Sequence, residues 1–150
     1  EAAPAWFLME NVRQAPLPCV SGYIVRDRLV NNRHVSSGNC AFGAEQSRVR
    51  RFSLGTRDGR DFHVRFAVFD NPHREPCFTA NAVQWDRDGG RSRSVRSWAS
   101  VERGLKAQGL APGFLSHAPF TAEGAITVIG NGVPLPLGRA IARAVKEAIT

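Results

Sequence analysis

Apolar side chains recur at a helical spacing near the end of the chain, at Leu137, Ile141, Val145 and Ile149. Charged side chains occupy the other side of the same segment, at Arg139, Arg143 and Lys146. This separation predicts an amphipathic helix, because one stripe would face a core and the other would face water. Pro134 and Pro136 suit its first turn, where the amide hydrogens have no acceptor within the helix.

Three segments in the first part of the chain have the pattern of strands. Residues 5–12 (AWFLMENV) form a short apolar run that ends in polar residues. That pattern predicts a strand buried on both faces, with its carboxyl end at an open edge. Residues 22–30 (GYIVRDRLV) predict a second strand that begins at Gly22, and residues 49–56 (VRRFSLGT) alternate in the manner of a third.

The middle of the chain has the pattern of antiparallel hairpins. The pair Asp58-Gly59 separates residues 49–56 from the alternating run 62–69 (FHVRFAVF), which predicts one hairpin. Residues 79–85 and 92–98 flank the turn sequence DRDGGR at 86–91, which predicts a second hairpin.

The periodicity changes after Trp98. Ser100 is placed to cap a short helix through VERGLKAQ, and Gly109 is placed to end it. Residues 111–124 contain Pro and Gly and predict a loop.

Length and composition favour one ordinary domain, since the chain has 150 residues of which 43 % are apolar. The sequence contains no uninterrupted apolar run of about 18 residues, so we expect no membrane partner. The three cysteines are odd in number and widely spaced, which favours a reducing compartment, the cytoplasm.

The charge of the chain favours a polyanionic partner. The net charge is +7, and only two of its 20 basic residues are lysines. The arginine side chain presents a planar, permanently charged fork that matches phosphates and base edges, so nucleic acid is the expected partner. A surface that is basic only because of arginine-rich codon usage explains the charge equally well, and on charge alone both interpretations stay open.

Four short motifs follow one another along the chain: MENV at 9–12, FGAEQSRVRRFSLGT at 42–56, SWASVERGLKAQGL at 97–110 and VIGNGVPLPLGRAIARAV at 128–145. In this order they resemble the C-terminal half of the DNA cytosine-5 methyltransferases. The first is similar to that family's Glu-Asn-Val motif, the second to its Gln-x-Arg-x-Arg motif, and the last to its Gly-Asn-x-Val-Pro motif. The third is similar to the segment that braces the recognition domain.

The resemblance implies a reaction and residues for it. In this family a cysteine thiolate adds to C6 of cytosine, and C5 then takes a methyl group from S-adenosylmethionine. The match gives Glu10 the role of the acid at N3 and Arg50 the role of the cation at O2, with Arg48 nearby. The cytosine must leave the duplex to reach them. Asn131, Gly132 and Val133 would line the cofactor side.

The partner implied by the resemblance is double-stranded DNA. Gln46 stands on the matching motif position, and the arginines of the second hairpin at Arg91, Arg93 and Arg96 are expected either to contact phosphates or only to be solvated, and not to read bases. A zinc site is not expected, because the histidines are scattered and His73, Cys77 and Cys40 lack close ligand pairs.

The sequence departs from the family at two motifs. Only nine residues precede Glu10, so the glycine-rich cofactor motif and the Pro-Cys motif of the nucleophile have no room before it. Pro18-Cys19 follows the glutamate, and we do not expect Cys19 to be the nucleophile. We therefore expect a companion chain, or the other piece of a longer precursor, to carry both motifs. Such a partner would also cover the open sheet edge.

The expected fold is therefore α/β: a partial Rossmann-like methyltransferase sheet, a small β-rich target recognition region and a C-terminal helix. The expected divisions are late catalytic strands at 1–56, the recognition region at 57–98, and a bracing helix with the closing motif at 99–150. The expected biology is DNA methylation, for example in restriction-modification. Two alternatives remain: a catalytically inactive fragment that only binds nucleic acid, and an RNA cytosine methyltransferase relative.

Overall fold

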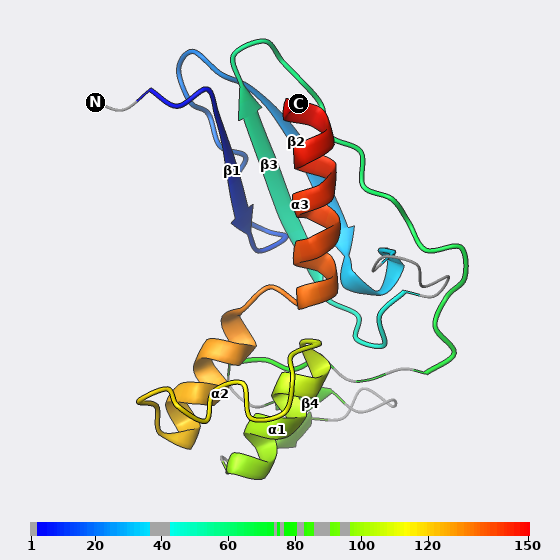
Figure 1. Ribbon diagram of the computed structural model, residues 1–150, viewed down its shortest axis with the longest axis vertical. Helices are drawn as coiled ribbons and strands as arrows, with labels where there is room; N and C mark the ends of the chain where they lie inside the picture. The colour runs from blue at the N-terminus through cyan, green and yellow to red at the C-terminus, as the bar shows by residue number, and fades with distance from the viewer. Residues whose placement is uncertain are drawn as a thin grey trace.

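A computed structural model describes residues 3–36, 43–73, 75, 77–80, 83–85, 91–93 and 97–150 (Figure 1). The elements follow the order β1 (Trp6–Asn11), β2 (Ile24–Asn31), the 3-10 turn η1 (Asn32–His34), β3 (Val49–Thr56), β4 (Val83–Trp85), β5 (Arg91–Arg93), α1 (Trp98–Ala107), α2 (Ala122–Asn131) and α3 (Leu135–Ile149). The chain is therefore a mixed α/β protein with a small antiparallel sheet and a long C-terminal helix, in agreement with the coarse part of the expected fold class.

The main sheet has three strands in the order β1-β3-β2, and both neighbours run antiparallel to the central β3. Phe52 of β3 lies opposite Glu10 on one side and Arg28 on the other. Since directly opposed residues share a face, these three side chains and their alternate neighbours belong to the same face. α3 lies along that face in Figure 1.

β1 is an edge strand, which corrects the expectation that both its faces are buried. Its side chains alternate between exposed and half-buried positions, and Trp6 and Leu8 remain 41 % and 38 % exposed. Among the described residues β1 pairs only with β3, so its other edge has no partner strand there. The run of apolar residues in AWFLM therefore does not correspond to a strand covered on both sides.

The predicted hairpin around Asp58-Gly59 is wrong. β3 pairs with β1 and β2, which occupy both of its edges, so residues 62–69 cannot pair with β3 as the hairpin requires. Phe62 instead packs into the core with no exposure, and Phe66 makes only an isolated bridge to Val35. The second hairpin is confirmed by the antiparallel pairing of β4 with β5, whereas its turn at 86–90 lies outside the described residues.

The helix ends follow local signals, with one correction. Ser97, not Ser100, is the N-cap of α1, because its hydroxyl accepts a hydrogen bond from the Ser100 amide. Gly109 follows α1 with a φ of 75°, a left-handed conformation that glycine adopts without strain. The predicted final helix is confirmed as α3, with Pro134 at its N-cap and Pro136 in its first turn.

Helix α2 was not predicted; the sequence indicated a loop over 111–124 and a turn around Asn131. Thr121 caps α2 by accepting from the Gly124 amide, and Ala125, Ile126 and Ile129 bury one side of the helix. This spacing of one and four residues is helical, but the β-branched run Ile-Thr-Val-Ile masks it, because such residues disfavour helices by intrinsic propensity.

Two apolar clusters hold these elements together. The first joins α3 to one face of the sheet, and its members include Val30, Phe52, Leu54, Leu137 and Ile141. The second joins α1 to α2 around a single aromatic ring, and its members include Phe78, Val101, Leu105, Ile126 and Ile129. Between them the chain passes from α2 to α3 at residues 132–134.

Residues 122–149 are apolar and long enough to be a candidate membrane span, with a mean hydropathy of 1.2 over the best window. In the structure they form two helices, α2 and α3, separated by residues 132–134. The apolar side of each helix faces one of the two clusters, and 44 % of the window is buried.

Candidate functional site

Glu10 and Arg50, which are 40 positions apart, meet on adjacent strands. Glu10 lies near the carboxyl end of β1, and Arg50 lies at the beginning of the antiparallel β3. The register places Arg50 diagonally next to Glu10 on the same face, and the Arg50 Nε donates to the Glu10 Oε1 at 2.8 Å. Their side chains are 16 % and 32 % exposed, so the pair is accessible from solvent but largely shielded.

The Arg50 guanidinium is partly buried and lies near one further cation and one carboxylate. Burial lowers the pKa of the Arg50 guanidinium, and the neighbouring charge of Arg48 lowers it further, while the Glu10 carboxylate opposes both. An arginine remains protonated at physiological pH despite such a shift. The site therefore holds two cations beside one carboxylate, an arrangement suited to a ligand with an acceptor oxygen or a negative charge.

The position of Arg48 does not fit the expected role of a side chain that lies beside the base. Its side chain is buried, and its guanidinium donates to the carbonyls of Phe78 at 2.9 Å and Gly130 at 2.6 Å. A third, longer contact of 3.6 Å joins it to the Cys77 Sγ. Arg48 thus connects the beginning of β3 to the segment before β4 and to the end of α2.

The segment Gly130–Val133 forms the end of α2 and the start of the connection to α3, which corrects the expected turn. Asn131 is the last residue of α2 and is exposed. Gly132 caps the helix with a φ of −64°, and Val133 packs against the cluster between α3 and the sheet. Gly130 allows a close approach, since a Cβ there would lie 2.1 Å from the backbone nitrogen of Ala80.

Gln108, from the third motif, joins the three helices. Its side-chain amide donates to the Ile129 carbonyl of α2 at 2.7 Å, and its backbone carbonyl accepts from the Leu135 amide of α3 at 2.8 Å. Gln108 itself caps α1. One buried residue therefore fixes the junction at which Asn131 and Val133 lie.

The expected DNA-binding residues are described only in part. Gln46 is 1 % exposed and its side chain does not reach the outer surface of the molecule, although the residue lines an internal cavity. Arg91 and Arg93 lie in β5, and Arg96 lies outside the described residues.

The described cysteines lie apart from each other, with Cys19 exposed between β1 and β2 and Cys77 half-buried. Sequence reasoning missed the position of Cys77 beside Arg48, because nothing local in the sequence indicates a contact over 29 positions. Among the residues that the structure describes, no three His, Cys, Asp or Glu side chains are grouped in a way that could hold a metal ion.

Comparison of the sequence with models of known protein families and with curated proteins gave no match. The function proposed for this chain therefore depends on its motifs and on the geometry of Glu10, Arg50 and the α2–α3 junction.

Proposed function

We propose that this chain is the C-terminal portion of a DNA (cytosine-5)-methyltransferase with a partial Rossmann-like catalytic sheet. In this proposal it acts on a cytosine that has left the duplex, and C5 receives a methyl group. The observation that carries the proposal is the contact between Glu10 and Arg50 at 2.8 Å. Each residue comes from a different motif of the resemblance, and the fold brings together the acid and the cation that the reaction requires.

The pair has the right chemistry for a pyrimidine edge. N3 and O2 are neighbouring atoms of cytosine, so a carboxyl and a guanidinium on adjacent strands can contact both. Glu10 would take up a proton from solvent as the base displaces its ion pair with Arg50, and would donate it to N3 as negative charge develops on the ring, while Arg50 would hold O2. The existing ion pair keeps both side chains oriented before the base enters, and this lowers the entropic cost of binding.

Arg48 acts in this proposal as a positioning residue. Its donors are directed at the Phe78 and Gly130 carbonyls, so it contributes charge to the site without contacting the base. Through Gly130 it also connects the Glu10–Arg50 pair to the end of α2, where Asn131 lies.

The α2–α3 junction suits one part of S-adenosylmethionine. Asn131 offers an exposed side-chain amide with both donors and an acceptor, which fits the polar amino-acid end of that molecule. Val133 offers a partly buried apolar side chain beside it. When bound, S-adenosylmethionine supplies the methyl group, and residues 131–133 would hold its methionine end.

A further segment or a companion chain supplies the nucleophile in this proposal, because the matched motifs contain no Pro-Cys pair. Cys19 lies exposed in the β1–β2 connection, after Glu10 in the chain. The second edge of β1 and the exposed Trp6 and Leu8 offer a surface on which such a partner could extend the sheet.

The test combines the chain with a polypeptide carrying the glycine-rich and Pro-Cys motifs and measures transfer of a labelled methyl group to DNA. Glu10→Gln should reduce the rate by about 10²–10⁴-fold, since it removes general-acid capability. Glu147→Gln is the matched control, because Glu147 also pairs with an arginine, Arg65 at 2.7 Å, but lies on α3. An unchanged rate in Glu10→Gln would contradict the assigned role.

Substrates and cofactor binding separate the alternatives. Transfer to transfer RNA but not to DNA would favour the RNA-modifying relative. Salt-sensitive DNA binding by the isolated chain, without affinity for S-adenosylmethionine, would favour the inactive nucleic-acid-binding fragment.

A further inference from the structure

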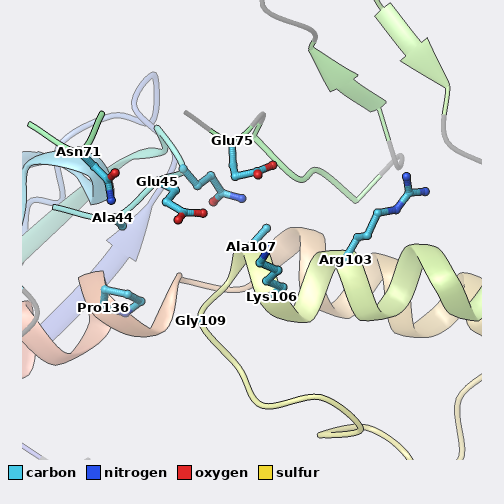
Figure 2. Close-up of a pocket in the computed structure, with 10 residues that line it drawn as sticks. Ala44, Glu45, Asn71, Glu75, Arg103, Lys106, Ala107, Gly109 and Pro136 are labelled. Carbon is cyan, nitrogen blue, oxygen red and sulfur yellow. The ribbon is translucent and has the colours of Figure 1, made fainter. Parts of the chain in front are cut away.

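A second site lies away from the Glu10–Arg50 pair. A cavity of about 360 Å³ opens between the segment before β3, Asn71, Glu75, α1 and the first turn of α3. Pockets that hold small organic ligands measure about 300–1,000 Å³. Figure 2 shows Glu45 and Glu75 on one side of this cavity and Ala107 and Lys106 of α1 on the other.

Gln46 lines the cavity with an unused amide. Its side chain is 1 % exposed, and neither its Nε2 nor its Oε1 has a hydrogen-bond partner among the described residues. Backbone pairing holds the residue in place, through a bridge to Glu75 and a bond from the Asn32 Nδ2 to the Gln46 carbonyl at 3.3 Å. Buried polar groups in native proteins almost always have partners, so this amide indicates a ligand with an adjacent donor and acceptor.

The charged residues at the cavity have opposite signs on opposite sides. The carboxylates of Glu45 and Glu75 face the side formed by α1, which contributes Arg103 and Lys106. In the described part of the chain none of these four forms an ion pair. A simple anion would be repelled by the carboxylates, and a simple cation would be repelled by the basic residues. The cavity therefore suits a ligand that carries hydrogen-bond donors at one end and a negative charge at the other.

We propose that this cavity binds a nucleotide. The base edge, which pairs a donor with an acceptor, would bond to the Gln46 amide once this side chain turns from its buried position into the cavity, as bases do with glutamine. The sugar hydroxyls would donate to the Glu45 and Glu75 carboxylates, and the phosphate would contact Lys106 and Arg103. Ala44, Ala107 and Pro136 supply apolar walls for the faces of the ring.

This site is independent of the proposed methyltransferase chemistry. Neither Glu10, Arg50 nor residues 131–133 line the cavity. Glu10→Gln should therefore leave nucleotide binding unchanged, and a failure of either proposal leaves the other standing.

The test titrates the full chain with AMP, CMP, GMP and UMP and follows the side-chain amide signals of Gln46 by NMR. At least one nucleotide should shift these signals at millimolar concentration. Gln46→Leu should weaken its binding about tenfold, the usual loss for a two-bond base contact. Lys106→Ala should weaken it several-fold, whereas Lys146→Ala, on the exposed side of α3, should not.

Three results would overturn the proposal: no shift with any of the four nucleotides, equal binding of the nucleoside without phosphate, or preference for a zwitterionic dipeptide such as Gly-Gln. If Gln46→Leu fails to fold, the comparison of Lys106→Ala with Lys146→Ala decides alone. If a short single-stranded oligonucleotide binds more tightly than a mononucleotide, the natural ligand is part of a nucleic acid chain. If the two bind equally, the natural ligand is a free nucleotide. Both of these support the site.

Discussion

Replacing Arg48 by methionine should destabilise the fold, even though arginine is usually a surface residue. The Arg48 side chain is buried and donates to the Phe78 and Gly130 carbonyls at 2.9 and 2.6 Å. Hydrogen bonds that involve a charged group contribute about 1.5–3 kcal/mol each. Methionine has a similar length but leaves both carbonyls without this donor, and the loss is partly offset because no charge has to be buried.

The expected decrease in the free energy of unfolding is therefore about 2–4 kcal/mol. With a urea dependence of about 2 kcal/mol per molar for a chain of this size, the midpoint of urea unfolding should fall by about 1–2 M. Arg48→Lys should lie between the wild type and Arg48→Met, because one ammonium keeps the charge but cannot direct a planar fork at two carbonyls. Arg139→Met is the control, since Arg139 is exposed on α3 and its loss should change stability by less than about 0.5 kcal/mol.

One result would refute this reasoning. If Arg48→Met unfolds at the same urea concentration as the wild type but loses methyl transfer or DNA binding, then Arg48 contacts a ligand directly. Its hydrogen bonds to Phe78 and Gly130 would then contribute little to holding the fold.

Four further changes test other parts of the structure. Gly130→Ala should destabilise the fold by about 2 kcal/mol or more in thermal unfolding, because the added Cβ would lie 2.1 Å from the Ala80 nitrogen. Gly132→Ala is the control and should have little effect, because its Cβ would meet nothing closer than 3.4 Å. Equal effects of the two substitutions would refute the packing argument. Gln108→Leu should cost about 1–3 kcal/mol and speed amide exchange at the α2–α3 junction, since the Ile129 carbonyl loses its donor; unchanged exchange would contradict the bracing role. Ile141→Ala should cost about 2–5 kcal/mol in urea unfolding, against almost nothing for the exposed Lys146→Ala. Glu10→Gln should change stability by no more than about 1 kcal/mol, because its ion pair is partly exposed, so a larger loss would mean that any drop in activity reflects unfolding.

Elements with a strong local period were predicted from the sequence. α3 follows from its apolar stripe and its two prolines, and β2 and β3 follow from their alternation and their flanking glycine and turn residues. α2 was missed because its helical spacing is carried by β-branched residues, whose propensity is opposed by burial against α1 and Phe78.

Pairing between distant segments was less predictable. The alternation of residues 62–69 indicates a strand, but β3 had no free edge for it, and no local pattern shows which edges are occupied. The proximity of Glu10 and Arg50 followed only from the resemblance. The partners of Arg48 are backbone carbonyls 30 and 82 positions away, and carbonyls have no signature in a sequence.

The position of α3 also has a consequence for the order in which the chain can fold during synthesis. The apolar face of the sheet, with Val30, Phe52 and Leu54, is covered by α3, which begins at Leu135, 79 positions after β3 ends at Thr56. Until Leu135 and the rest of α3 have left the ribosome, the nascent chain therefore exposes this apolar face, although its strands have already been synthesised. During that interval the polypeptide should depend on holding chaperones, and translational pausing before α3 should increase its aggregation.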